Sequence, residues 1–247
     1  MPKILIADDN PVTLRFFAEA MAQLGFACEL AHDGAEAVSL ARRTSFDLLL
    51  FDARMPELDG VQALARIRGE SGPSRTALAV ATTASTDETA HLELIAGGFA
   101  EVIAKPVGVE ALRLLLARHL GSSNRLGTPR TADTVADIDD ASALAAVGGE
   151  RSILAALRGL LVAELEALPA ELDALAQRAD AVALRDRLHR LDASAGFCGT
   201  PALARASAAL RTALDAQTAW PTAAIADFLA ACAAVRVKLL ASEFPAA

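Results

Sequence analysis

The sequence predicts two domains of different fold class: a five-stranded, parallel, doubly wound α/β domain, followed by an all-α antiparallel helical bundle. A chain of 247 residues is long enough for two ordinary domains. Over residues 1–120, short apolar runs alternate with stretches of helical period, whereas residues 137–247 carry only the helical period. Residues 121–136 between them are rich in Gly, Ser, Thr and Pro, which is typical of a linker.

The elements expected in the first domain alternate strictly between strand and helix. Apolar runs indicate buried strands at residues 4–7, 28–30, 48–51, 78–81 and 102–104, of which the second is the weakest. Helical periodicity indicates helices at residues 11–24, 34–43, 60–69, 86–96 and 107–119. The first helix has a clear start, because Asn10 can cap it and Pro11 suits its first position. This alternation predicts a parallel sheet with helices on both faces.

Leucines at three- and four-residue spacing dominate the second domain. They indicate helices at residues 140–147, 150–178, 180–197, 203–214 and 225–239. The first of these ends at Gly148-Gly149, and the long second one contains Pro169, a residue that favours a kink. Several helices joined by short connections predict an antiparallel bundle.

Composition excludes several functions. The net charge is −8, aromatic residues make up 4% and Tyr is absent, so neither a basic field nor a stacking platform for nucleic acid is expected. The three cysteines, Cys28, Cys198 and Cys232, lie far apart, which predicts neither a disulfide framework nor a zinc site. The first apolar run is too short for a signal peptide, and no run of 18 apolar residues occurs. We therefore expect a cytoplasmic protein that binds no membrane.

Polar side chains gather where the carboxyl ends of the expected parallel strands meet. Asp8 and Asp9 end the first strand, Asp52 ends the third, Thr83 follows the fourth and Lys105 follows the fifth. In open α/β sheets the functional crevice lies at this edge. Three carboxylates close together would repel one another unless a cation were bound, and hard oxygen ligands suit Mg²⁺. A lysine beside them suits an anionic ligand such as phosphate.

These residues carry a resemblance to a known family. Asp8-Asp9, the segment from Asp52 to Gly60, Thr83-Ala84 and Lys105-Pro106 resemble the receiver domain of bacterial two-component response regulators. The resemblance covers residues 1–120 and implies a flavodoxin-like fold. It also implies a phosphoacceptor protein, with Mg²⁺-dependent self-phosphorylation and self-dephosphorylation, rather than a turnover enzyme.

The resemblance also assigns a role to each site residue. Asp52 is the expected phosphoacceptor. Mg²⁺ is the expected cofactor, held directly by Asp9, Asp52 and the backbone carbonyl of Arg54, with Asp8 contributing through water. Thr83 and Lys105 are expected to bind the phosphoryl oxygens. We assign Thr83 rather than Thr82, because it precedes a small alanine and has the family's spacing to the lysine.

One position departs from the receiver pattern. Receivers usually carry Tyr or Phe three residues before the lysine, and this ring turns inward on phosphorylation. Here that position is Val102, and Phe99 lies out of register. We expect any conformational response to phosphorylation to proceed without the aromatic side chain.

A single histidine of the second domain has polar neighbours at helical spacing. His32, His91 and His119 are interpreted as surface or turn histidines. His189 instead lies on a polar helix face, with Arg185 and Asp186 before it and Asp192 after it. The small residues Gly196 and Gly199 predict a shallow patch nearby, where an exposed imidazole could accept a phosphoryl group.

The segment from Leu188 to Gly199 resembles the phosphorylation motif of histidine-phosphotransfer (HPt) domains, and the resemblance covers about residues 137–247. It implies that His189 is a phosphohistidine. The family usually has Lys three residues after the histidine and Gly four after, whereas this chain has Asp192 and Ala193. The aspartate places a negative charge one helical turn from the imidazole, where it would repel a phosphoryl group.

Two functions remain open after these comparisons. The first is a phosphorelay protein that accepts phosphate on Asp52 and transfers it through His189. Its partners would be a sensor histidine kinase or phosphorelay protein, and a downstream receiver or signalling protein. The second is a signalling adaptor with a working receiver and an HPt-like bundle that only binds partners. A DNA-binding regulator is disfavoured, because residues 121–247 carry 12 Lys and Arg against 15 Asp and Glu. A metal-dependent hydrolase would need substrate-binding elements that the sequence lacks.

Overall fold

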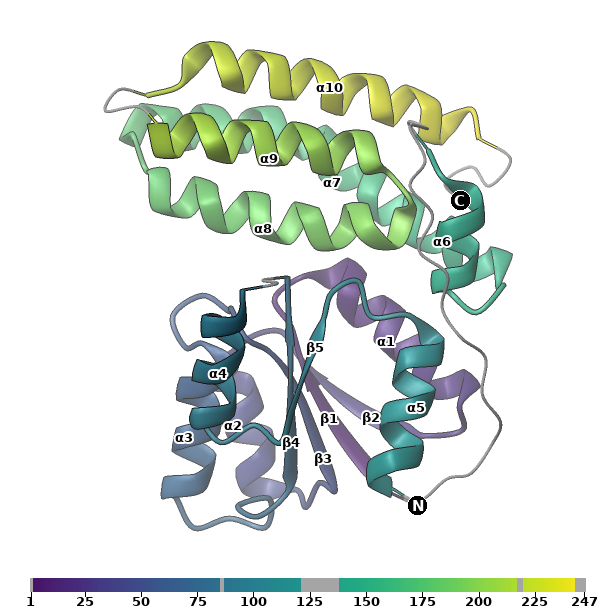
Figure 1. The fold of residues 1–247 in the computed structure, drawn as a ribbon, viewed down its shortest axis with the longest axis vertical. Coiled ribbons are helices and arrows are strands. Elements are labelled where there is room, and N and C mark those ends of the chain that lie inside the picture. Colours follow the sequence, from purple (N-terminus) through teal and green to yellow (C-terminus); the bar gives the residue numbers. More distant parts are fainter. Residues whose placement is uncertain (1, 85–86, 121–137, 217–219, 243–247) are drawn as a thin grey trace. The chain divides into compact units, whose positions relative to one another are not determined.

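The computed structural model describes residues 2–84, 87–120, 138–216 and 220–242. The chain divides into two compact units, Met1–Pro129 and Arg130–Ala247. Figure 1 shows the first as a sheet flanked by helices and the second as a group of helices. The linker expected at 121–136 lies outside the described residues, so the exact domain boundaries stay a prediction.

The first unit alternates strand and helix as the sequence predicts. Its elements are β1 (Lys3–Ala7), α1 (Pro11–Gln23), β2 (Ala27–Ala31), α2 (Gly34–Arg43), β3 (Leu48–Asp52), α3 (Gly60–Gly69), β4 (Leu78–Thr83), α4 (Glu88–Ala96), β5 (Glu101–Ala104) and α5 (Val109–Leu120). All neighbouring strands are parallel, in the order β2-β1-β3-β4-β5. This is the flavodoxin-like order, and it confirms the predicted fold class.

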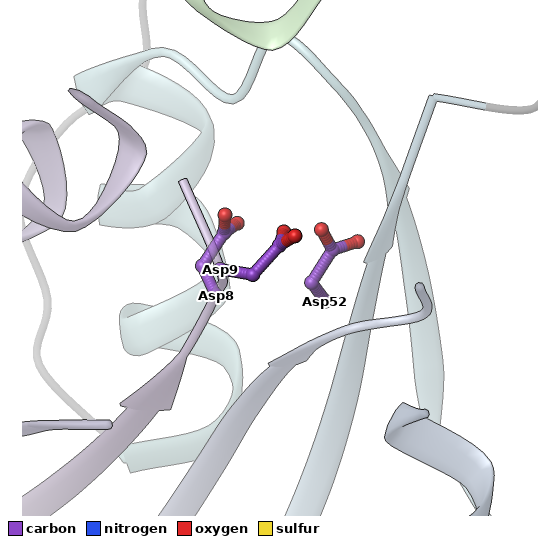
Figure 2. A group of neighbouring side chains, drawn as sticks. All are labelled: Asp8, Asp9 and Asp52. Carbon is purple, nitrogen blue, oxygen red and sulfur yellow. The ribbon is translucent and has the colours of Figure 1, made fainter. Parts of the chain in front are cut away.

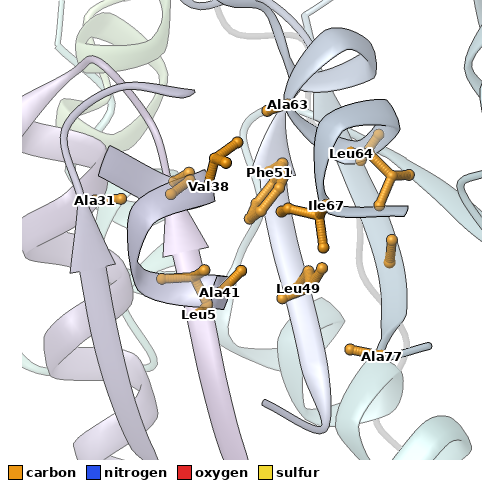
Figure 3. Packing of buried hydrophobic residues seen from close by; sticks show 14 of the residues in the cluster. Leu5, Ala31, Val38, Ala41, Leu49, Phe51, Ala63, Leu64, Ile67 and Ala77 are labelled. Carbon is orange, nitrogen blue, oxygen red and sulfur yellow. The ribbon is translucent and has the colours of Figure 1, made fainter. Parts of the chain in front are cut away.

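Helices cover both faces of the sheet. Figure 1 shows α1 and α5 on one face, and α2, α3 and α4 on the other. The central strand β3 is therefore buried over its whole length. On the side of α2 and α3, apolar side chains interdigitate around Phe51, as Figure 3 shows; they include Leu5, Val38, Leu49, Leu64 and Ile67. This packing fixes the strand ends that carry the polar residues.

The fourth strand is longer than its apolar run predicts. Leu78–Ala81 carries the hydrophobic signal, but β4 continues through Thr82 and Thr83. Thr82 pairs in register with Asp52, and Thr83 pairs with Ala104. Threonine is β-branched and suits a strand. Because its side chain is polar, however, the apolar run stops at Ala81 although the strand continues to Thr83.

The second unit is an antiparallel bundle with one additional short helix. Its elements are α6 (Asp140–Ala146), α7 (Arg151–Arg178), α8 (Ala181–Cys198), α9 (Pro201–Ala216) and α10 (Thr222–Leu240). Helices α7, α8, α9 and α10 each pack on the next, and α10 packs back on α7. Pro169 does not end α7. The predicted all-α class is confirmed. Among the helices described, none combines the length and apolar character that a membrane span needs.

A buried arginine joins several elements of this bundle. The Arg158 side chain is 0% exposed. Its guanidinium donates to the Cys198 carbonyl at the end of α8, from Nη2 at 3.1 Å and from Nε at 3.3 Å. It also donates to Asp140 Oδ1 at 2.5 Å and to Ser242 Oγ at 3.3 Å. These contacts connect α7 to α6, to the end of α8 and to the segment after α10. The sequence pattern gave no sign of them.

Candidate functional site

The parallel sheet brings the predicted acidic residues to one edge. Asp8 and Asp9 directly follow β1, and Asp52 is the last residue of β3, the strand next to β1. Figure 2 shows the three carboxylates turned toward one another. One oxygen of each lies within 4.8 Å of the others, so the group could share a metal ion. The cluster predicted from the sequence is present in the fold.

Lys105 follows β5 directly and reaches across this cluster. Its Nζ lies 2.8 Å from Asp8 Oδ2 and 2.7 Å from Asp52 Oδ2, with 3% of its side chain exposed. Two buried carboxylates therefore share one ammonium. Three carboxylates against one ammonium leave negative charge in excess, which a divalent cation would offset.

Burial and the lysine act in opposite directions on the acids. Burial raises the pKa of Asp8 to about 6, although the ammonium of Lys105 opposes the rise. Burial also raises the pKa of Asp52, again against Lys105. Burial would lower the pKa of Lys105, but the two carboxylates outweigh it and raise that pKa. The lysine is therefore held as a cation at physiological pH.

Backbone groups fix the orientation of two carboxylates. The Asn10 N–H donates to Asp8 Oδ1 at 2.9 Å, while the Asn10 side chain caps α1. The Arg54 N–H donates to Asp52 Oδ1 at 3.3 Å. One oxygen of each acid is thus held by backbone and the other by Lys105. Sequence reasoning identified Asn10 only as a helix cap and did not find its contact with Asp8.

Gly60 lets the chain pass close behind the last residue of β3. A Cβ at position 60 would lie 2.3 Å from the Asp52 carbonyl oxygen and 3.3 Å from Ala53 Cα. Both neighbours are backbone atoms, so they cannot swing away. The end of β3 at Asp52 and the loop that carries Arg54 therefore need glycine here.

We expect Gly60→Ala to lower the free energy of unfolding of the first unit by about 1–3 kcal/mol, because it forces backbone apart at the site. Gly69→Ala is the matched control: a Cβ there meets nothing within 4 Å. At the end of α3 this control should cost nothing or stabilise slightly. Urea unfolding followed by circular dichroism measures both. Equal costs for the two variants would contradict the role of Gly60.

The remaining residues of the predicted receiver site lie at the same edge or beneath it. Thr83 ends β4 and is 7% exposed, while Thr82 is 1% exposed. Neighbouring strand residues point to opposite faces, so only one of these hydroxyls can serve the site; the choice of Thr83 stays a prediction. Val102 is partly buried against the same apolar cluster that contains Phe99.

The expected histidine lies on α8 in surroundings that differ from the prediction. His189 is half-buried and its Nε2 atom is buried, so the exposed imidazole expected from the sequence needs correction. Asp192 is not an isolated negative charge, because its carboxylate pairs with Arg211 on α9. Arg185 pairs across the same two helices with Asp215 at 2.8 Å. The sequence missed Arg211 because a pair between antiparallel helices depends on their register, which leucine spacing does not specify.

Two further expectations about the second unit and the histidines need correction. Gly199 does not contribute to a surface patch: it is buried, with φ +64, and ends α8 in a left-handed conformation. A Cβ there would lie 2.4 Å from the Asp139 carbonyl oxygen, so the role of Gly199 is close packing.

Among the other histidines, His119 has a definite partner, since its Nε2 lies 2.8 Å from Glu101 Oε2. His32 and His91 are exposed, as predicted.

The fold and the carboxylate–lysine cluster together define a receiver domain. Residues 4–117 match the model of the response regulator receiver domain, and this part of the chain belongs to that family.

Relatives in sequence include signal-transduction kinases. The chain is 28% identical over 205 residues to the signal transduction histidine-protein kinase BarA of Escherichia coli K12, covering 80% of this chain and 22% of that protein. It is 29% identical over 235 residues to the sensor histidine kinase GacS of Pseudomonas protegens, covering 91% and 25%. The chain thus spans about a quarter of the length of these relatives. Both alignments extend beyond residues 4–117 and so include part of the helical unit.

Among solved structures, the receiver domain of the sensor histidine kinase PA1611 from Pseudomonas aeruginosa PAO1 is 32% identical to this chain. The match covers 49% of this chain and 98% of the PA1611 receiver domain, and its TM-score is 0.45. That domain was crystallised with a magnesium ion coordinated in its active-site cleft.

Proposed function

We propose that this chain is a phosphorelay protein that accepts a phosphoryl group on Asp52 and transfers phosphate through His189. The observation that carries the first half is the Lys105 ammonium held between the Asp8 and Asp52 carboxylates, at the edge of the sheet where a third acid is available. The relationship to signal-transduction histidine kinases over both units supports the second half. Partners of matching chemistry are phosphohistidine donors and receiver-type acceptors.

The residues at the sheet edge fit a magnesium ion. Asp9, Asp52 and the Arg54 carbonyl would hold it directly, and Asp8 would hold it through water. The excess of negative charge over the single Lys105 ammonium favours such a cation. When bound, Mg²⁺ supplies positive charge that offsets the charge on the phosphoryl oxygens.

Phosphorylation of Asp52 is a nucleophilic displacement at phosphorus. A carboxylate oxygen of Asp52 forms the new O–P bond, and the bond from phosphorus to the donor nitrogen breaks. The donor nitrogen leaves with the electron pair of that bond. Lys105 then binds the phosphoryl oxygens with its ammonium, and the Thr83 hydroxyl donates a hydrogen bond to them. The Lys105 ammonium favours the product because it already lies beside Asp52, and the Thr83 hydroxyl would add to this from the end of β4.

The test of the second half uses the full-length chain and phosphoramidate with Mg²⁺. An aspartyl phosphate is lost in alkali, whereas a phosphohistidine survives alkali and is lost in acid. We expect alkali-stable label on the parent protein and complete loss of it in His189→Gln. His32→Gln, at an exposed histidine, should retain the label.

Two outcomes would contradict a phosphorelay. If the parent takes no alkali-stable label from phosphoramidate or from a phosphorylated receiver, the bundle only binds partners and the adaptor function holds. If His189→Gln keeps the label, another nitrogen is the acceptor. The presence of Asp192 at the usual lysine position is the observation that favours the adaptor.

A further inference from the structure

Asp192 takes part in an ion pair that links two helices. Its Oδ2 accepts a hydrogen bond from Arg211 Nη1 on α9. The same Nη1 lies 3.3 Å from Ser207 Oγ, one turn earlier on α9. The Asp192 side chain is 19% exposed and that of Arg211 is 35% exposed. The pair is therefore partly shielded, while the guanidinium still reaches the surface of the bundle.

The ion pair lies beside the imidazole. His189 precedes Asp192 by three positions, so both side chains leave α8 on the same side, with Cβ atoms about 5–6 Å apart. Arg185, four positions before His189, leaves on that side too and pairs with Asp215 of α9. His189 thus stands between two ion pairs that both connect α8 to α9.

Arg211 has hydrogen-bonding capacity to spare. A guanidinium carries five N–H donors in a planar fork, and this shape matches phosphoryl oxygens. The contacts with Asp192 and Ser207 both use Nη1. Contacts within the described residues therefore leave Nε and Nη2 of Arg211 as donors for an anion on its exposed side.

We infer that Arg211 is the cation that faces a phosphoryl group on His189, and that Asp192 positions it. The inference rests on the proposed phosphorelay function. It accounts for the missing lysine at position 192: the positive charge comes from the neighbouring helix, and the aspartate holds it in place. The net charge that the phosphoryl group meets on this side is then close to zero rather than negative.

The reaction used in the test is transfer from phosphoramidate to the imidazole. An unprotonated ring nitrogen of His189 bonds to phosphorus, while the P–N bond of phosphoramidate breaks. Ammonia leaves with the electron pair of that bond. Arg211 takes no proton in this step; it stabilises the negative oxygens by charge-assisted hydrogen bonds.

The experiment uses the 247-residue chain carrying Asp52→Asn, which removes transfer from Asp52, and it measures the part of the alkali-stable label that is lost in His189→Gln. We expect Arg211→Gln to slow labelling about five-fold, because a partly exposed charge is lost and Asp192 becomes unpaired. Arg211→Lys should recover most of the rate. Asp192→Asn added to Arg211→Gln should recover part of it, because the repelling carboxylate is removed. High salt should shrink all three differences.

The control is Arg236→Gln, which breaks a comparable ion pair with Glu166 between α10 and α7. It should label at the parent rate. If Arg211→Gln also labels at the parent rate, the inference fails while the proposed function stands. If the parent protein takes no label on His189, the proposed function fails and this inference fails with it. A rate restored by neither Arg211→Lys nor Asp192→Asn would show a structural role and overturn the inference.

Discussion

Asp52→Asn is expected to remove all alkali-labile phosphoryl label from the chain, a loss of at least a hundred-fold against the parent. The amide has nearly the shape of the carboxylate but carries no negative charge, so it cannot attack phosphorus. Lys105 keeps its contact with Asp8 at 2.8 Å, so the sheet edge retains an ion pair and the domain should still fold. The measurement is intact-protein mass spectrometry after incubation with phosphoramidate and Mg²⁺.

The matched control lies at the other end of the same strand. Asp47 directly precedes β3, and its carboxylate accepts a hydrogen bond from the Lys3 N–H at 2.7 Å. Asp47→Asn should label like the parent. Adding EDTA to the parent should lower labelling as strongly as Asp52→Asn does, because the acid cluster needs a cation to accept further negative charge. Full alkali-labile label on Asp52→Asn, or undiminished label in EDTA, would refute the assignment.

The strands and the receiver site were predictable because local signals and a general rule of sheet topology coincide. Apolar runs ending at Asp8 and Asp52 mark both the strand and its polar end. Parallel pairing then brings those ends to one edge, whatever the details of packing. The weakest prediction, the strand around Cys28, proved to be the edge strand β2, in which Cys28, Glu29 and Leu30 are only partly buried. An edge strand pairs on one side only and needs less apolar sequence.

The contacts of the second unit were not predictable in the same way. Leucine spacing identifies each helix and its inner face, but it does not specify which residue of one helix lies opposite which residue of the next. The pairing of Asp192 with Arg211 depends on that register. So do the contacts of the buried Arg158, which follows the leucine spacing of α7, because that spacing does not identify its partners on α6 and at the end of α8. Tertiary register therefore decides the electrostatics near His189.

Arg158→Met is expected to lower the free energy of unfolding of the second unit by about 2–3 kcal/mol. Methionine fills a similar volume, so the cost is electrostatic rather than a cavity. The Cys198 carbonyl would lose the two donors it has at 3.1 and 3.3 Å, in a place that water does not reach. Asp140 would lose its partner as well, but at 38% exposure it can turn to water, which keeps the cost below that of a fully buried pair.

Arg236→Met is the comparison that separates burial from ion pairing. Arg236 and Glu166 pair at 2.8 Å, with side chains 35% and 67% exposed, so the loss should be at most about 1 kcal/mol. Trp220, the only tryptophan of the chain, reports on the second unit by its fluorescence during urea unfolding. A lower midpoint with an unchanged slope is expected for Arg158→Met. If both variants lose the same stability, burial of Arg158 contributes nothing beyond an ordinary surface pair, and its hydrogen bonds to the end of α8 do not hold the bundle together.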